Sequence, residues 1–210
     1  MSQSLTAATI SVTSKLVVAA LADKGFKRKS PHLLRQSQDV VHGIHFQSSQ
    51  WGTASDGRFT VNLIVTAPAL YEGWTGRPLP ANPATASHPI QQRIGFCLPP
   101  KTDLWWTVNP QTDTESLAQE AAGVIVQNAP AFFALFPNMG AILAHLRETS
   151  SLPGLTRQQA ALTHAHLAHL AGASGEAENL LSVALALATN SLFKSTVQEF
   201  ANRVGISIPQ

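Results

Sequence analysis

The sequence predicts an α+β protein in which a small antiparallel sheet packs with an N-terminal helix and a largely helical C-terminal half. Two early segments alternate between apolar and polar residues, as strands with one buried face do, and the chain after residue 108 shows capping signals and helical spacing. The 210 residues can form a sizeable core, and a charged fraction of only 12% leaves little charged surface. A surface of this kind is compatible with a homo-oligomer.

The first element is predicted to be a helix from about Leu5 to Lys24, with Gly25 as its left-handed C-cap. The face that its helical spacing predicts to be buried consists of Val12, Leu16, Ala19 and Ala20. The cations near the end of this helix are Lys24, Lys27, Arg28 and Lys29. We interpret them as charges that complement the helix dipole, and an anion site is the alternative. Pro31 then ends the helical option, and His32–Ser37 is predicted to be a short edge strand.

The strongest strand signals begin at Val40 and at Phe59. The apolar faces that should point to the core are Val40, His42, Ile44 and Phe46, and then Phe59, Val61, Leu63 and Val65. The opposite, mixed face contains His45, Gln47 and Asn62, although threonine or charged residues would solvate a sheet as well. Amides donate and accept hydrogen bonds without carrying charge, so this face is the leading candidate for a binding surface. The alternative is that helices cover it and that the amides satisfy backbone groups.

The middle of the chain has weaker signals. Residues 68–92 are rich in proline and lack periodicity, which predicts a functional or poorly ordered connection. A further strand is predicted over Gln92–Leu98. Trp105 and Trp106 follow as neighbours in an extended segment, so one should be buried and the other should be exposed or line a groove.

The helical half is predicted from its capping residues. The capping signals are Thr112 with Glu115, Asn138, and Thr156 with Gln159. Pro130 is expected to begin a separate short helix. We expect residues 151–210 to form a helical extension packed on a domain of residues 1–150. Within the extension, Arg157–Leu187 resembles one tetratricopeptide unit, because its small residues allow two antiparallel helices to approach closely. Those small residues are Ala165, Gly172, Ala177 and Ala184.

Several function classes are disfavoured. A net charge of +2 gives no strong signal for nucleic-acid binding. The single cysteine, Cys97, excludes an internal disulfide framework and is expected to be a small buried hydrophobe. His166 and His169 share a helix face from which His164 points away, and no carboxylate or cysteine accompanies them, so we expect no metal and no cofactor. Standard hydrolase and nucleotide-binding motifs are absent.

The amino terminus lacks the basic and apolar stretches of a secretory signal, and no apolar run approaches the ~20 residues that cross a bilayer. We therefore expect a soluble, cytoplasmic protein without a membrane partner.

A series of short motifs occurs in a fixed order over about residues 5–136. The motifs are GFKRK (Gly25–Lys29), Arg35, FQSS (Phe46–Ser49), FTVNL (Phe59–Leu63), RIG (Arg93–Gly95) and DLWW (Asp103–Trp106). Together they resemble a bacterial family known as domain of unknown function 4304. That family tends to have an aromatic residue shortly before the strand arginine, where this chain has Leu33 and Leu34, and a glycine where it has Ile64. The resemblance implies an α+β domain and carries no established activity.

Three functions are open. The favoured one is a non-catalytic domain that binds an unknown protein or small ligand through the mixed sheet face. The second is an enzyme with His45 as general base and Arg93 as a stabiliser of an anion or oxyanion. The third is an immunity or antitoxin-like partner of a toxin, against which the charge of +2 argues mildly. The candidate binding residues are Arg35, His45, Gln47, Ser49, Asn62, Arg93, Trp105 and Trp106.

Overall fold

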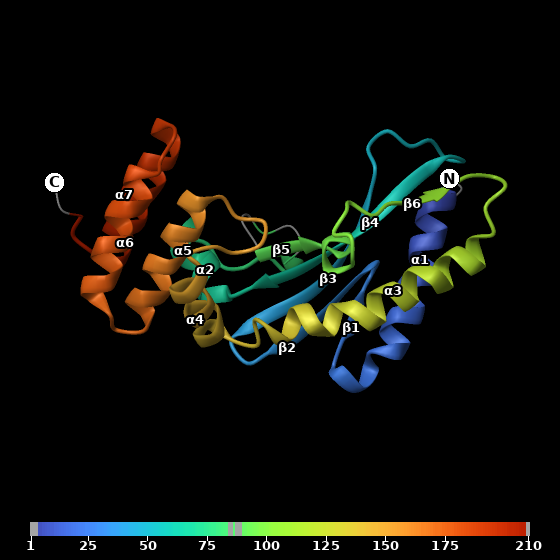
Figure 1. Cartoon of the computed structure of the whole chain (residues 1–210), viewed down its shortest axis with the longest axis horizontal. Coiled ribbons are helices and arrows are strands. Elements are labelled where there is room, and N and C mark those ends of the chain that lie inside the picture. Colours follow the sequence, from blue (N-terminus) through green and yellow to red (C-terminus); the bar gives the residue numbers. More distant parts are fainter. Residues whose placement is uncertain (1–3, 84–85, 87–89, 209–210) are drawn as a thin grey trace. The chain divides into compact units, whose positions relative to one another are not determined.

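The computed structural model describes residues 4–83, 86 and 90–208, and it has the predicted α+β fold (Figure 1). The strands are β1 (Lys27–Lys29), β2 (His32–Ser37), β3 (Val40–Ser48), β4 (Gly57–Thr66), β5 (Ile90–Arg93) and β6 (Trp106–Val108). The α-helices are α1 (Leu5–Ala20), α2 (Pro68–Thr75), α3 (Thr114–Ala134), α4 (Met139–Thr149), α5 (Arg157–Leu170), α6 (Ser174–Ala186) and α7 (Ser191–Val204). Short 3-10 helices are η1 (Ala22–Lys24) and η3 (Ile94–Cys97).

The chain divides into two compact units. The first, which we call the sheet unit, comprises Met1–Ser37, Val41–Val65 and Gln91–Leu135. The second, the helical unit, comprises Gln38–Val40, Thr66–Ile90 and Phe136–Gln210. Taken singly, no helix in the described part of the chain is long and apolar enough to cross a membrane.

The sheet has the strand order β1-β2-β3-β4-β5, and β6 also pairs with β4. The β1–β2 and β4–β6 pairs are antiparallel, with Lys27 opposite Leu34 and Gly57 opposite Val108. A backbone hydrogen bond of 2.8 Å from Ser49 to Arg58 closes the β3–β4 hairpin and sets its register. β3 pairs with one edge of β4. The other edge of β4 is therefore shared by β5 and β6.

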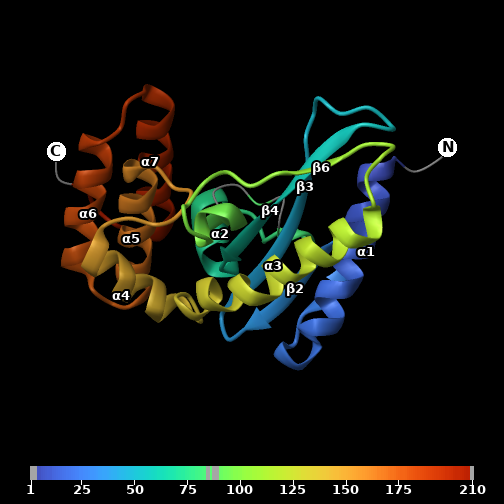
Figure 2. The same cartoon turned by 45° about the vertical axis from the view of Figure 1, so that its right-hand side comes forward.

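One face of the sheet packs against α1 and α3, which lie side by side in both Figures 1 and 2. Phe59, Val61 and Leu63 of β4 are fully buried, as predicted. On this face the Phe133 ring of α3 stacks on His42 of β3, with ring centroids 4.7 Å apart. The core of the sheet unit therefore lies between this face and the two helices.

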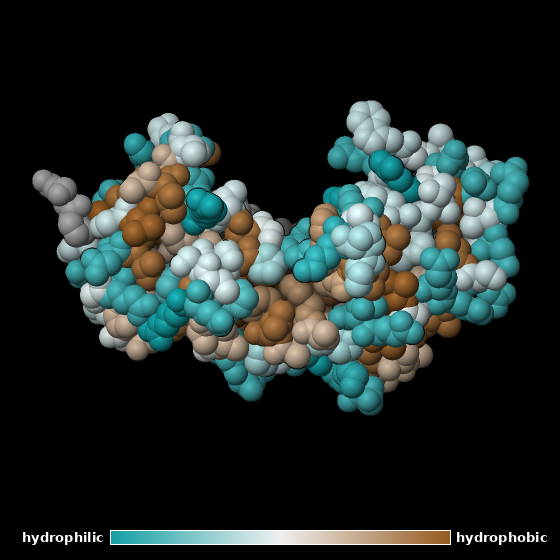
Figure 3. All heavy atoms as spheres, in the orientation of Figure 1, coloured by the Kyte–Doolittle hydropathy of each residue, from teal (hydrophilic) through white to brown (hydrophobic). Residues whose placement is uncertain are grey.

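The prediction for the buried face of α1 was wrong. Val12 and Leu16 are 41% and 38% exposed, and the helix buries a face rich in threonine and serine instead. The Thr9 and Thr13 hydroxyls donate to backbone carbonyls one turn earlier, at 2.9 Å each, so their polar atoms are satisfied when they are buried. Figure 3 shows hydrophobic residues interspersed with hydrophilic ones on the visible face of each unit, so single exposed apolar side chains are ordinary here.

The basic residues after α1 do not lie at a helix end, except for Lys24 in η1. Gly25 has the predicted left-handed conformation, with φ of 79°, and it ends η1. Lys27–Lys29 then forms β1. From β1, Arg28 donates to the hydroxyl of Ser14 at 2.8 Å, so this cation binds the polar buried face of α1.

Segments without periodicity were predicted least accurately. Residues 68–92 contain α2, which begins with a proline at its first turn where no N–H is needed. Residues 84–85 and 87–89 of this segment lie outside the described residues. The predicted strand Gln92–Leu98 begins earlier, at Ile90, and gives way to η3 after Arg93.

Two predictions for α3 were also wrong. Its N-cap is Asp113 rather than Thr112, and the Asp113 carboxylate accepts hydrogen bonds from the backbone N–H groups of Glu115 and Ser116, at 3.1 Å each. The helix then continues through Pro130 instead of restarting there. Proline fixes a helical φ and costs one backbone hydrogen bond, and the burial of Phe132 and Phe133 on the core face offsets that loss.

The helical unit confirms the other capping predictions. Asn138 caps α4, and Thr156 and Gln159 form a capping box at the start of α5. The small residues of α5 and α6 pack closely, since Ala165, Ala177 and Ala184 are all fully buried. A core of α5, α6 and α7 results, and its largest fully buried side chain is Phe200.

Candidate functional site

The register of the sheet aligns polar side chains from four adjacent strands on the face opposite α1 and α3. We call these residues the polar row: His32 of β2, His45 and Gln47 of β3, Asn62 of β4, and Gln91 of β5. The hairpin bond between Ser49 and Arg58 places His45 opposite Asn62, because pairing shifts by two residues along each strand. Successive strands therefore supply successive members of the row.

Asn62 is the centre of the polar row. Its amide nitrogen donates to Gln47 Oε1 at 2.8 Å and contacts His45 Nδ1 at 3.5 Å. Its carbonyl oxygen accepts from Gln91 Nε2 at 3.2 Å. Asn62 is only 1% exposed, so the predicted exposure of its amide was wrong. Its hydrogen bonds go to other side chains rather than to the backbone, and it therefore positions residues that are themselves half-buried.

The two histidines of the row are neutral at neutral pH. Their ring centroids lie 4.4 Å apart. Burial, and then the nearby His32, lowers the pKa of His45 to about 4, and burial also lowers the pKa of His32. His32 Nδ1 accepts the backbone N–H of Phe46 at 3.3 Å, and His45 Nδ1 faces the donating amide of Asn62. In both rings Nδ1 is thus the acceptor, and Nε2 carries the proton and is the remaining donor of the ring.

Thr60 lies next to Asn62 on the same face of β4. Its side chain is fully buried, and its hydroxyl has no hydrogen-bond partner among the described residues. A buried hydroxyl without a partner costs about 1–3 kcal/mol.

Beyond Thr60 the face continues into a stacked cluster of two arginines and a tryptophan. The guanidinium carbons of Arg58 and Arg93 lie 4.8 and 5.2 Å from the centre of the Trp105 ring. Asp103 accepts from Arg93 at 2.5 Å and from Trp105 Nε1 at 2.9 Å. Slight desolvation raises the pKa of Asp103, but these hydrogen bonds and the positive charges of both arginines outweigh it and lower the pKa overall. Both guanidinium groups therefore contact the Trp105 ring, and Asp103 links Arg93 to the indole of Trp105.

Of the two adjacent tryptophans, Trp106 is buried, as predicted for one of them, and Trp105 is half-buried. Trp106 stacks on Phe59 with ring centroids 5.3 Å apart, and its indole nitrogen donates to Glu120 at 3.1 Å. It belongs to the core face, so its predicted place on the recognition surface was wrong. Trp105 belongs to the stacked cluster instead.

The other predicted residues lie apart from the row. Arg35 is on the opposite face, where its Nε donates to His42 Nδ1 at 3.0 Å and its guanidinium lies 5.0 Å from the Phe26 ring centre. Burial lowers its pKa. Ser49 lies at the start of the β3–β4 loop, where its hydroxyl accepts the backbone N–H of Trp51 at 3.3 Å.

Sequence reasoning missed His32, Gln91, Thr60 and Arg58. Alternation from Asn62 to Thr60 and Arg58 within one strand could have identified the last two. His32 and Gln91 needed the pairing of β2 with β3 and of β5 with β4, which no local pattern specifies. The described residues contain no group of three or more histidine, cysteine or acidic side chains that could hold a metal ion.

Comparison with known proteins gives one match. Residues 17–135 match the model of the family described as Domain of unknown function (DUF4304). No curated protein and no solved structure matches the chain. The matched residues include all of the polar row and the whole stacked cluster.

Proposed function

Because the chain belongs to the DUF4304 family, whose description states no activity, we propose a function from the polar row: a non-catalytic domain that binds an uncharged amide, as in a peptide or a small amide-bearing ligand. The observation that carries the proposal is the hydrogen-bonded arrangement of five neutral side chains across four strands around a buried asparagine. Such an arrangement fixes rotamers in advance, so little entropy is lost when a ligand binds.

The unused hydrogen-bonding capacity of the row matches an amide. Gln47 Nε2 can donate, as can the Nε2 atoms of His32 and His45, while Gln91 Oε1 can accept. The described residues supply no partner for these atoms. Donors and an acceptor side by side complement the C=O and N–H of an amide, and the absence of charge within the row favours a neutral group over an ion.

Catalysis with His45 as general base has less support. A histidine with a pKa of about 4 is a weak base at neutral pH, whereas efficient general bases have a pKa near the working pH. The Arg93 guanidinium is also engaged by Asp103 and by Trp105. A role as an immunity or antitoxin-like partner stays a prediction that no feature of the described residues favours.

The test uses capped amino-acid amides, such as N-acetylglycinamide, and the corresponding N-acetyl amino acids as anionic counterparts. We expect the capped amides to shift the side-chain amide signals of Gln47 and Gln91 in nitrogen-resolved NMR spectra. The carboxylates should bind at least tenfold more weakly, because a neutral, partly desolvated row does not compensate a charge.

Gln47→Ala and Gln91→Ala should each weaken binding of the capped amides about tenfold, as expected for the loss of one well-formed hydrogen bond. Gln92→Ala is the matched control, since Gln92 is adjacent to Gln91 but points to the other face. The proposal fails if Gln47→Ala and Gln91→Ala bind as well as the control. It also fails if each lowers the melting temperature as much as Phe59→Ala, because the row would then be purely structural.

A further inference from the structure

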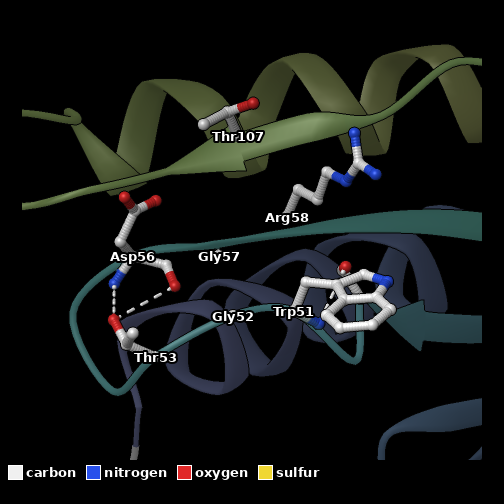
Figure 4. Close-up of a pocket in the computed structure, with 8 residues that line it drawn as sticks. Trp51, Gly52, Thr53, Asp56, Gly57, Arg58 and Thr107 are labelled. Carbon is white, nitrogen blue, oxygen red and sulfur yellow. Dashed lines mark hydrogen bonds between the residues drawn. The ribbon is translucent and has the colours of Figure 1, made fainter.

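A pocket of about 280 Å³ lies between the β3–β4 loop and β6, separate from the polar row. Its walls carry a tryptophan, an aspartate, an arginine and hydroxyl groups from both sides (Figure 4). The functional side chains that line it are Ser49, Trp51, Thr53, Asp56, Arg58 and Thr107. From these groups we infer that the pocket binds a neutral saccharide unit.

The loop that forms the pocket is held in place before any ligand binds. Thr53 and Asp56 are joined by three hydrogen bonds. The Asp56 N–H donates to the Thr53 hydroxyl at 3.0 Å, and the Asp56 carbonyl accepts from the Thr53 N–H at 2.5 Å and from the Thr53 hydroxyl at 3.3 Å. The N–H of Leu5 in α1 binds the Ala54 carbonyl at 3.0 Å. A preorganised loop of this kind favours binding, because ordering it would otherwise cost affinity.

Two glycines of the pocket allow close packing of the backbone around them. A Cβ on Gly52 would lie 3.1 Å from the Gly57 Cα, and a Cβ on Gly57 would lie 2.6 Å from the Thr6 hydroxyl. The backbone of the loop and of β4 therefore approach each other more closely than side chains would permit.

The charged groups of the pocket cancel. Figure 4 shows Asp56 and Thr53 towards one end of the pocket, with Trp51 and Arg58 towards the other. No described residue donates a hydrogen bond to the Asp56 carboxylate, and none accepts one from the Arg58 guanidinium, whose contact is the Trp105 ring. The pocket therefore offers one strong acceptor and one strong donor group at its two ends, with a net charge of zero.

Trp51 supplies an exposed aromatic surface in the pocket. Its indole is 90% exposed, although a large aromatic side chain gains most by burial. An exposed indole on an ordered loop provides a flat apolar surface on which a ligand can stack.

A saccharide unit meets these conditions together. Its hydroxyl groups donate to a carboxylate and accept from a guanidinium, and both hydrogen bonds are strengthened by the protein charge. Its ring C–H face stacks on an indole. A phosphate would be repelled by Asp56 and a cationic side chain by Arg58, so an ion of either sign fits less well.

The experiment titrates the protein with glucose, galactose, N-acetylglucosamine and their disaccharides while the indole N–H signals are followed by NMR. Trp→Phe variants assign the signals. We expect at least one sugar to shift the Trp51 signal and to leave the buried Trp106 signal in place. Trp51→Ala and Asp56→Asn should each weaken that binding at least tenfold, whereas Trp51→Phe should retain part of it.

Gln50→Ala is the control variant, because Gln50 is exposed on the same loop and does not line the pocket. Since Trp51 and Asp56 are exposed, their variants should keep the melting temperature of the parent. The inference is overturned if no sugar of the panel moves the Trp51 signal, or if binding survives both variants. It is also overturned if uridine monophosphate or a short oligothymidylate shifts the signal in place of the sugars. Gln47→Ala should not change sugar binding, so the outcome is independent of the polar row.

Discussion

Each unit of the molecule buries one polar side-chain atom for which the described residues supply no partner, and the two surroundings differ. In the sheet unit it is the Thr60 hydroxyl, beside a row of side chains that satisfy one another. In the helical unit it is Nδ1 of His166, whose ring packs against Gly73 of α2 and lies 4.9 Å from the Phe200 ring centre. The first atom lies beside a network with spare capacity for hydrogen bonds, and the second is enclosed by a packing contact.

The histidines of the two regions also differ in their surroundings, although their pKa values change alike. Burial lowers the pKa of both His45 and His166 to about 4, helped by His32 in the first case and by His169 and Arg203 in the second. The direction and size of the change are alike, but only His45 has side-chain partners that fix its tautomer. A perturbed histidine is therefore a poor guide to a binding site, and its hydrogen-bond partners are a better one.

The largest effect should come from Gly73→Ala in the packing contact. A Cβ at Gly73 would overlap the His166 imidazole, while alanine improves helix propensity by only about 1 kcal/mol. Overpacking should dominate and reduce the free energy of unfolding by about 3 kcal/mol, measured by urea denaturation.

Gly175→Ala in α6 is the control, because no atom lies within 4 Å of a Cβ added there. It should be neutral or stabilising. The double variant Gly73→Ala with His166→Ala should be less destabilised than the sum of the two single changes. Simple additivity would mean that the imidazole is not what Gly73 accommodates.

The second prediction concerns acid. His166 is only 2% exposed, and it stays neutral in the folded state while the unfolded chain takes up a proton below about pH 6.5. Stability should therefore fall as the pH drops from about 6.5 to about 4, by up to about 3 kcal/mol for this group, and the loss should level off below its folded pKa.

The measurement is the urea midpoint at several pH values for the parent protein and for His166→Leu. Removing the titrating group should flatten the acid-dependent part of the profile. His45→Asn should flatten it in the same direction through the sheet unit. An unchanged profile in His166→Leu would show that another group causes the acid loss.

The sequence predicted the fold correctly where apolar residues recur at a regular spacing. The alternation in β3 and β4 identified both strands and the faces of Phe59, Val61 and Leu63, because a strand with one buried face repeats every two residues. The helix α1 shows the limit of the same reasoning. Its apolar stripe at Val12 and Leu16 is exposed, since threonines that bond to their own helix backbone can be buried in its place.

The candidate site was predicted in part for the same reason. His45, Gln47 and Asn62 were found from their own strands, and the structure brings these three together. His32 and Gln91 joined them only through strand pairing, which depends on contacts distant in sequence. The burial of Asn62 could not be inferred from alternation, because alternation identifies a face and says nothing of what covers it.

The smallest effect should come from Thr60→Val, which tests whether the buried hydroxyl beside the polar row is a true cost. Valine has the same shape and removes a polar atom that has no partner among the described residues. The variant should be more stable by about 1 kcal/mol, seen as a higher urea midpoint, because the desolvation penalty disappears and the packing is kept. Thr107→Val in β6 is the control, since its hydroxyl is exposed and its loss should be nearly neutral. A loss of stability in Thr60→Val would mean that the hydroxyl does have a partner, such as an ordered water. Of the two buried atoms compared above, His166 Nδ1 in the helical unit would then be the one without a partner.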